Sequence, residues 1–269
     1  MPSVDQIRVR DVQGDALRRL LAHCLGQSRL WCLNNPDYTL TPPQNQHFQA
    51  LKNRLDTGEP ISKILGQRSF WRDDFVTTHD VLDPRPDSET LIQAVLQRYP
   101  DQQAPYRLLD LGTGSGCLLL SVMGEYPNAH GVGVDLSPAA LSVAQRNGAR
   151  LGRFPLWIQG NWGEGLTGPF DIILSNPPYI PTEVCQTLDV AVRVFDPMMA
   201  LDGGADGLQA YQALMPHLQR LLAPTGMAFL EIGDTQAADV TRIAEKKDLK
   251  IHSIEKDLEN RDRCVIMGL

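Results

Sequence analysis

The stretch "LLDLGTGSG", residues 108–116, decides the fold. Its first residues are mostly apolar and suit a short buried strand. Its three glycines permit positive φ angles and let a ligand approach the backbone closely. The run "SGCLLLSVMGEY", which overlaps its end, is apolar enough for a buried helix. A strand, a glycine-rich turn and a helix in this order are typical of the ligand-binding edge of an α/β sheet.

Strand and helix patterns continue to alternate from here to the end of the chain. Such alternation predicts an α/β fold with a doubly wound, mostly parallel sheet that binds ligands at the carboxyl ends of its strands. We expect strands in "RLLDLG", "HGVGVDL", "PLWIQG", "FDIILSN" and "MAFLEIG", helices in "SPAALSVAQRNGARLG", "DGLQAYQALMPHLQRLLAPTG" and "TQAADVTRIAEKK", and two final strands in "LKIHSIEKDLENRDRCVIMGL".

The first 85 residues have a different pattern. Two segments, "GDALRRLLAHCLG" and "TPPQNQHFQALKNRLDTG", space their apolar residues as helices do, and Thr41 and Pro42 suit the start of the second helix. The segment "GQRSFWRDDFVTTHDVLDPRP" is typical of a β-hairpin followed by a proline-marked boundary. We therefore expect two domains: residues 1–85, with helices and a hairpin linker, and residues 86–269, with the sheet.

The composition argues against several classes of protein. No apolar run approaches the ~20 residues of a membrane span, and the N-terminus lacks the apolar core of a signal peptide. We therefore expect a cytoplasmic protein with no membrane partner. The five cysteines are odd in number and scattered, which argues against a disulfide framework or a zinc site. The six histidines show no metal-binding spacing, so no metal is predicted.

The net charge of −7 is unevenly distributed along the chain. Residues 1–85 hold 11 Lys or Arg and 10 Asp or Glu, whereas residues 86–269 hold 14 and 22. An acidic sheet domain argues against a protein that grips phosphate backbones over a wide surface. The charge therefore favours a small-molecule, protein or basic-segment partner, and we expect no direct contact with nucleic acid.

Two carboxylates identify the kind of ligand that the glycine turn would hold. The spacing is G-x-G-x-G rather than the dinucleotide pattern G-x-G-x-x-G, and Asp110 precedes Gly112 by two residues. An acid there would repel a pyrophosphate but suits a cationic amino-acid group. Asp135, at the end of the next strand, can accept hydrogen bonds from both ribose hydroxyls. Together these features predict S-adenosylmethionine; a nicotinamide dinucleotide is the alternative ligand, and a charge at the start of the next helix is the alternative role of Asp135.

Trp162 belongs to "GNWGEG", which follows a further expected strand at the same sheet edge. Its indole could lie against an adenine face, because aromatic rings stack on flat groups. Equally, it could close one end of the hydrophobic core. The sequence leaves both roles open.

The motif "NPPY", residues 176–179, ends a further strand next to the expected cofactor site. Its two prolines make a rigid ledge, because they fix two φ angles and remove two backbone donors. Asn176 can accept one N–H of a planar substrate nitrogen through its side-chain oxygen, and the carbonyl of Pro177 can accept the other. Tyr179 would offer its ring to the flat group. Holding both hydrogens would turn the nitrogen lone pair toward a methyl donor.

The combined motifs make the chain similar to the seven-stranded, Rossmann-like S-adenosylmethionine-dependent N-methyltransferases. The whole chain resembles the HemK/PrmC family, which methylates the glutamine side chain of the GGQ motif in class I peptide-chain release factors. "NPPY" alone is shared with adenine-N6 nucleic-acid methyltransferases, whereas "RPDSE" and the "DGG-x-DGL" segment favour the glutamine branch. The matching pieces are "EPISKILGQRSFW", "VLDPRPDSET", "LLDLGTGSGCLLLSV", "GVDLSPAALSVAQRN", "SNPPYIP", "ALDGGADGLQAYQ", "LEIG" and "RDRCV".

The resemblance implies roles for particular residues. It also implies that the N-terminal helical domain, residues 1–85, helps to recognise the release factor. It leaves two alternatives: an adenine-N6 methyltransferase of nucleic acid, and a scaffold that binds the cofactor without catalysis. Asn161, Asn260 and Asp83 depart from the family pattern. The implied cofactor-binding residues are Asp110, Gly112, Thr113, Gly114, Ser115, Gly116, Asp135, Trp162 and Asn176, and the implied substrate-binding or catalytic residues are Asn176, Pro177, Pro178 and Tyr179.

Overall fold

The computed structural model describes residues 7–269, which form two compact units. The units meet in the chain between Gly66 and Gln67. The boundary expected from the sequence lies at residue 85 and puts the hairpin in the first domain. In the structure the hairpin belongs to the second unit, because its aromatic residues lie in the core of that unit.

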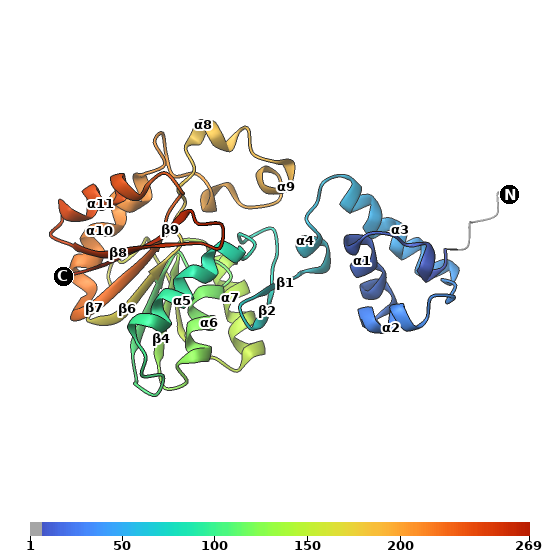
Figure 1. The fold of residues 1–269 in the computed structure, drawn as a ribbon, viewed down its shortest axis with the longest axis horizontal. Coiled ribbons are helices and arrows are strands. Elements are labelled where there is room, and N and C mark those ends of the chain that lie inside the picture. The colour runs from blue at the N-terminus through green and yellow to red at the C-terminus, as the bar shows by residue number, and fades with distance from the viewer. Residues whose placement is uncertain (1–6) are drawn as a thin grey trace. The chain divides into compact units, whose positions relative to one another are not determined.

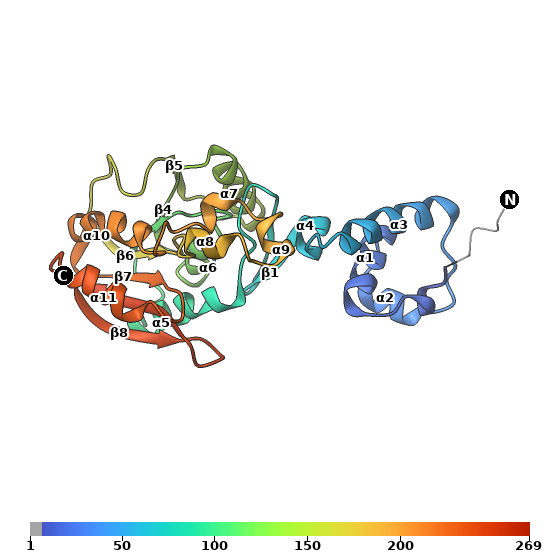
Figure 2. The ribbon, with the colours of Figure 1, turned by 90° about the horizontal axis from the view of Figure 1, so that it is seen from above.

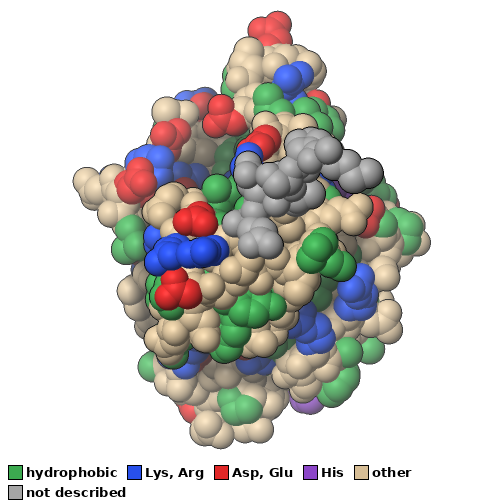
Figure 3. All heavy atoms as spheres, turned by 90° about the vertical axis from the view of Figure 1, so that its right-hand side faces the viewer, with side chains coloured by type: hydrophobic (Ala, Val, Ile, Leu, Met, Phe, Trp, Pro, Cys, Tyr) green, Lys and Arg blue, Asp and Glu red, His purple; other side chains and the backbone are tan. Residues whose placement is uncertain are grey.

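The first unit is a small group of helices, shown side by side in Figure 2. The expected helix start at Thr41 is present: Thr41 and Gln44 form a capping box, and Pro42 is the first helical residue. The apolar faces of the helices meet in a core that includes Leu20 and Phe48. Figure 3 shows Lys and Arg side chains interspersed with Asp and Glu on the face drawn there. The helices are η1 (Val9–Asp11), α1 (Asp15–Leu25), α2 (Arg29–Asn34), α3 (Pro42–Asp56) and α4 (Ile61–Leu65).

The second unit contains the predicted doubly wound sheet, with seven strands in the order β5-β4-β3-β6-β7-β9-β8 (Figure 1). Neighbouring strands are parallel except at β9, which is antiparallel to both β7 and β8. A separate hairpin is formed by β1 (Gln67–Phe70) and β2 (Asp73–Val76), as expected. The sheet strands are β3 (Arg107–Leu111), β4 (His130–Asp135), β5 (Leu156–Gln159), β6 (Phe170–Ser175), β7 (Leu222–Glu231), β8 (Lys250–Lys256) and β9 (Asp262–Gly268).

Helices cover both faces of this sheet, because its central strands bury side chains on both sides. In β3, Leu108 belongs to the cluster formed with α5 and α6, whereas Leu109 belongs to the cluster formed with α10 and α11. No helix among the described residues is long and apolar enough to cross a membrane. The elements outside the sheet are η2 (Pro86–Ser88), α5 (Glu89–Arg98), α6 (Cys117–Glu125), α7 (Pro138–Leu151), α8 (Thr182–Cys185), α9 (Val190–Arg193), η3 (Met198–Ala200), α10 (Gln209–Leu221) and α11 (Ala237–Glu245).

Candidate active site

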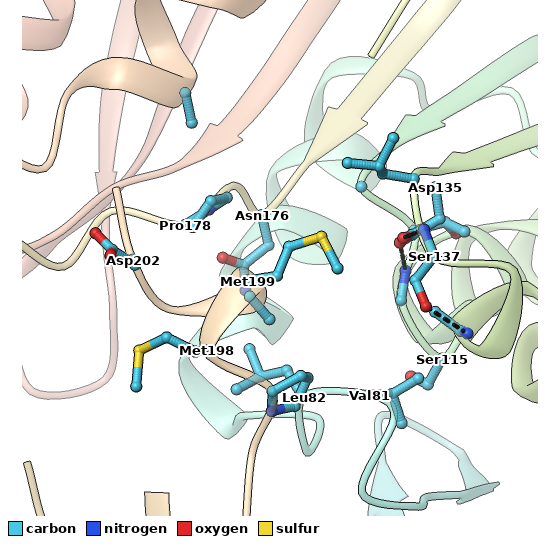
Figure 4. A pocket seen from close by; sticks show the side chains of 18 of the residues that line it. Val81, Leu82, Ser115, Asp135, Ser137, Asn176, Pro178, Met198, Met199 and Asp202 are labelled. Atoms are coloured by element: carbon cyan, nitrogen blue, oxygen red, sulfur yellow. Dashed lines mark hydrogen bonds between the residues drawn. The ribbon is translucent and has the colours of Figure 1, made fainter. Parts of the chain in front are cut away.

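A cavity of about 880 Å³ lies where β3, β4 and β6 end, at the carboxyl edge of the sheet. This is the edge at which α/β sheets bind ligands, and the volume falls within the usual range for small-molecule sites. Figure 4 shows Asp135, Ser115 and Ser137 on one side of the cavity and Met198 and Pro178 toward the other. The cavity is therefore lined by the predicted cofactor turn and by segments for which the sequence predicts no role in the site.

The glycine turn opens the cavity to a ligand at Gly114. Gly112, Gly114 and Gly116 all have positive φ angles, of 76°, 56° and 78°. A side chain at Gly114 would meet no atom within 4 Å, so this backbone is accessible. A Cβ at Gly116 would lie 2.9 Å from the Trp157 ring, so that glycine serves the packing of strand against helix. Gly112, Thr113, Gly114 and Ser115 line the cavity, and Gly116 does not.

Asp135 lines the cavity and joins the glycine turn to the start of α7. One carboxylate oxygen accepts the backbone N–H of Gly114 at 2.8 Å, and the other accepts that of Ser137 at 2.9 Å. The Ser137 hydroxyl caps α7 by accepting the N–H of Ala140. Each carboxylate oxygen has a further lone pair, so the same side chain can also accept ribose hydroxyls. The helix-start role is present, and it leaves the ribose role available.

Asp110 is buried behind the turn and does not itself line the cavity. One of its carboxylate oxygens accepts the Thr113 hydroxyl at 2.6 Å, and the other has no hydrogen-bond partner among the described residues. Burial raises the pKa of this carboxyl to about 7, and the nearby charge of Asp135 adds to the rise. A buried, unpartnered carboxylate oxygen behind the turn suits a cationic ligand group near it.

Trp162 combines the two roles that the sequence left open. Its ring lines the cavity and also packs against the core cluster that includes α10. A Cβ on Gly112 would lie 3.3 Å from that ring, so the ring lies over the glycine turn. The neighbouring Asn161 also lines the cavity, and its amide donates to Glu164 at 2.8 Å. The indole is thus available as one wall of an adenine pocket.

Only part of the "NPPY" motif lies at the cavity. Asn176 and Pro178 line it, whereas Pro177 is buried and Tyr179 lies behind the ledge. The Tyr179 hydroxyl donates to the Glu231 carboxylate at 3.3 Å, and burial together with the Glu231 charge raises the pKa of the phenol. The Asn176 amide donates to Ser88 Oγ at 3.1 Å. The side-chain oxygen of Asn176 forms no hydrogen bond with any residue that the structure describes.

Several cavity residues were not predicted from the sequence. Ser88 and Asp83 come from the segment "VLDPRPDSET", and Met198 and Met199 come from η3. The buried Asp83, a departure from the family pattern, accepts the Thr77 hydroxyl. The pattern "VLDPRPDSET" was available as a motif, but nothing in its local chemistry indicates that it contacts residues almost one hundred positions away.

Three further sequence features are the expected absence of a metal site, the departure at Asn260 and the scattered cysteines. Among residues 7–269, no group of three or more His, Cys, Asp or Glu side chains could hold a metal ion. Asn260 has a φ of 63°, so it occupies the left-handed turn position that a glycine would otherwise fill. The cysteines among the described residues are free thiols.

Comparison with known proteins places the chain among methyltransferases. Two family models match it: "PrmC N-terminal domain" over residues 6–66 and "Methyltransferase small domain" over residues 69–198. The chain is 45% identical to a release factor glutamine methyltransferase of Rhodospirillum rubrum, covering 93% of this chain and 77% of that protein. It is 39% identical to that of Caulobacter vibrioides, with 93% and 87% covered. A ribosomal protein L11 methylase from Lactobacillus delbrueckii shares the fold, with a TM-score of 0.51 at 17% identity over 75% of this chain and 88% of that one.

Proposed function

The chain belongs to the family of release factor glutamine methyltransferases, and we propose that its cavity methylates the glutamine of the GGQ motif in class I peptide-chain release factors. The methyl group passes to the side-chain amide nitrogen of that glutamine. The observation that carries the proposal is Asn176, which lines the cavity with a side-chain oxygen that no described residue engages. Such an oxygen is available to accept an N–H of the substrate.

S-adenosylmethionine is the methyl donor, and it supplies an electrophilic methyl group on a sulfonium sulfur. The residues at the cavity fit this molecule. The open backbone at Gly114 allows close approach, the Asp135 carboxylate can accept hydroxyls, and the buried Asp110 carboxylate has one oxygen without a hydrogen-bond partner among the described residues. We assign cofactor binding to the turn from Gly112 to Ser115, to Asp135 and to Trp162, with Asp110 acting from behind the turn. Gly116 would act through packing.

The ledge would activate the substrate by orientation. An amide nitrogen is a weak nucleophile because its lone pair is delocalised into the carbonyl. The Asn176 side-chain oxygen would accept one N–H of the substrate. Acceptance of the other N–H by the carbonyl of Pro177, a buried residue that does not line the cavity, stays a prediction. Together the two acceptors would turn the lone pair toward the methyl donor. Orientation of this kind can supply several of the ~7–11 kcal/mol available from proximity. Pro178 would form the rigid floor, and contact between the Tyr179 ring and the substrate stays a prediction.

An adenine-N6 methyltransferase of nucleic acid is the second candidate, because it also uses a ledge of this kind. It needs a basic surface that contacts phosphates. The second unit, residues 67–269, instead holds 17 Lys or Arg and 26 Asp or Glu. This balance favours a basic protein substrate, and direct binding of nucleic acid is not expected. The cytoplasmic location also stays a prediction.

One experiment separates these functions. The protein is incubated with S-adenosylmethionine labelled on its methyl group, a release factor and unmethylated DNA, and a second reaction contains a release factor with the GGQ glutamine changed to alanine. We expect label on the intact release factor and none on the variant. Label on DNA alone would favour the second candidate, and a protein that binds the cofactor but labels neither substrate would be a non-catalytic scaffold.

A further inference from the structure

Three motifs that support the family resemblance have no part in the reaction as described so far. They are "RPDSE" at the start of α5, "LEIG" at the end of β7 and "RDRCV" at the start of β9. In the structure they converge behind Asn176 through Ser88, Glu231 and Arg263. The hydrogen bonds from Asn176 to Ser88 and from Ser88 to Glu231 run in one direction.

The direction is set by the single hydrogen of the Ser88 hydroxyl. Ser88 Oγ donates to Glu231 Oε2 at 2.5 Å, and the Tyr179 hydroxyl donates to Glu231 Oε1. An ionised carboxylate can only accept, so Ser88 must give its hydrogen to Glu231. Its oxygen then offers only lone pairs to Asn176. Asn176 must therefore turn its NH₂ group toward Ser88, and its oxygen is left for the cavity.

We propose that Ser88 and Glu231 are positioning residues, which hold the Asn176 side chain with its oxygen toward the substrate amide. Without Ser88 and Glu231, nothing would determine whether the oxygen or the NH₂ group of the Asn176 amide faces the cavity. A reversed amide would present hydrogens to the substrate N–H and would repel it. This inference rests on the proposed function, because it concerns the residue that accepts the substrate N–H.

The burial of the pair supports this role. Ser88 and Glu231 are both only 2% exposed, so no bulk water can replace either partner. A carboxylate in such a place is costly unless its hydrogen-bond donors are fixed. Tyr179 supplies a second donor and is itself held through its backbone carbonyl, which accepts the Gln236 amide at 3.0 Å. The ledge and the carboxylate therefore fix each other.

The short helix η2, which carries Ser88, is also anchored on two sides. Arg85 pairs with the buried carboxylate of Asp196 at 2.7 Å, which ties the start of η2 to the loop before η3. Asp87 lies 3.5 Å from the guanidinium groups of Arg261 and Arg263 in the C-terminal hairpin. These contacts hold the backbone on both sides of Ser88 and so fix the position of its hydroxyl.

The test compares substitutions in the pair with a matched buried serine. Ser121 is 1% exposed and its hydroxyl has no partner among the described residues, so Ser121→Ala removes the same atom without breaking a hydrogen bond. The enzyme is assayed on a release factor at a pH above the value of about 7 to which burial raises the pKa of Glu231. We expect Ser88→Ala to lower kcat by about tenfold to hundredfold. The cofactor Kd should stay within about twofold of wild type, as should kcat of Ser121→Ala.

A double-mutant cycle separates positioning from general damage. Glu231→Gln keeps the shape of the side chain but lets position 231 donate as well as accept, so kcat should fall here too. If Glu231 acts through Ser88, the double variant Ser88→Ala/Glu231→Gln should be no slower than Ser88→Ala alone. Losses that multiply, or a Ser88→Ala enzyme with wild-type kcat, would overturn the proposal. Glu231→Gln is isosteric, so if Ser88→Ala folds poorly, a Glu231→Gln enzyme with wild-type kcat would still overturn the proposal.

A readout that needs no activity distinguishes failure of this inference from failure of the proposed function. The side-chain NH₂ signal of Asn176 is assigned by NMR from its absence in Asn176→Asp. One of its protons should exchange with water at least about tenfold faster in Ser88→Ala than in wild type. Unchanged exchange refutes the positioning role even if the wild-type enzyme methylates its substrate. Faster exchange supports it even if the substrate is a different amide.

Discussion

The side-chain amide of Asn176 donates to Ser88 Oγ across 3.1 Å, although 88 positions separate the two residues in the chain. This contact joins the ledge after β6 to the short helix η2, and it gives the ledge a defined chemical direction. The amide nitrogen donates one of its hydrogens to Ser88. The oxygen is the part of the side chain left for a ligand, and the first prediction tests it.

Asn176→Ala should lower the rate of methyl transfer by about 10²–10³, because the substrate loses a preorganised hydrogen-bond acceptor. The measurement is kcat on an intact release factor. Asn128→Ala is a matched control, since its exposed amide donates to the Gln103 carbonyl far from the cavity. A variant that keeps its melting temperature and more than half of wild-type turnover would contradict the role.

The fold could be predicted because each of its signals is local. The strand and turn around Gly112, the proline at the start of α7 and the alternation of apolar runs each specify structure within a few residues. Asp135 and Asn176 could be predicted as site residues for the same reason, since both directly end a strand of a parallel sheet. For each of these two residues, one short segment of sequence shows both the type of side chain and its place at the end of a strand.

The Ser88–Glu231 pair could not be predicted, because its function depends on a contact between distant segments. Ser88 lies before α5 and Glu231 ends β7, and neither position differs from an ordinary helix start or strand end. The roles of Gly116 and Tyr179 were harder to predict for the same reason. Their motifs lie at the edge of the sheet where the cavity is found, but only tertiary packing determines which member of a motif reaches the cavity.

Asp135→Ala should raise the Kd for S-adenosylmethionine at least about tenfold, because charge-assisted hydrogen bonds to the ribose are each worth about 1.5–3 kcal/mol. Calorimetry measures the constant directly. Asp239→Ala removes an exposed carboxylate paired with Arg242 and should leave the constant unchanged. Asp135→Asn keeps the shape of the side chain but replaces one carboxylate oxygen with an NH₂ group, which cannot accept the N–H of Gly114 or Ser137. An unchanged Kd in both Asp135 variants would limit Asp135 to its role at the start of α7.

Asp110 should make the free protein less stable as the pH rises. Its pKa is raised from 3.8 to about 7 in the fold, so folding favours the neutral form. That contribution is fully present below the unfolded pKa and is lost as pH rises through about 7. Asp110→Asn keeps an acceptor for Thr113 and cannot ionise. The fall in melting temperature between about pH 5 and pH 8 should therefore be smaller in Asp110→Asn than in wild type. Equal slopes would show that Asp110 does not titrate in this range.

The last prediction concerns how the release factor is recognised. A glutamine in a loop that works inside the ribosome lies on a domain that meets RNA, so that domain should be basic. The second unit carries 26 acidic and 17 basic residues, and complementary charge mainly accelerates association and weakens with salt. Raising the salt from about 50 mM to about 500 mM should raise KM for a whole release factor. Because the charge effect acts on association and the methyl transfer follows once the substrate is bound, kcat should change little.

The first unit would add contacts of defined shape to this attraction. Its 8 basic and 6 acidic residues leave it nearly neutral, so its contribution should depend little on salt. Deletion of residues 1–66 is the right truncation, since Phe70 and Phe75 of the hairpin belong to the core of the second unit. The truncated enzyme should bind S-adenosylmethionine with a Kd close to that of the full chain, while its KM for the release factor rises at least about tenfold. A KM that is independent of salt would refute electrostatic docking. A truncated enzyme that methylates the intact factor as efficiently as the full chain would refute a recognition role for the helices, because it would show that the sheet unit alone holds the loop over Asn176.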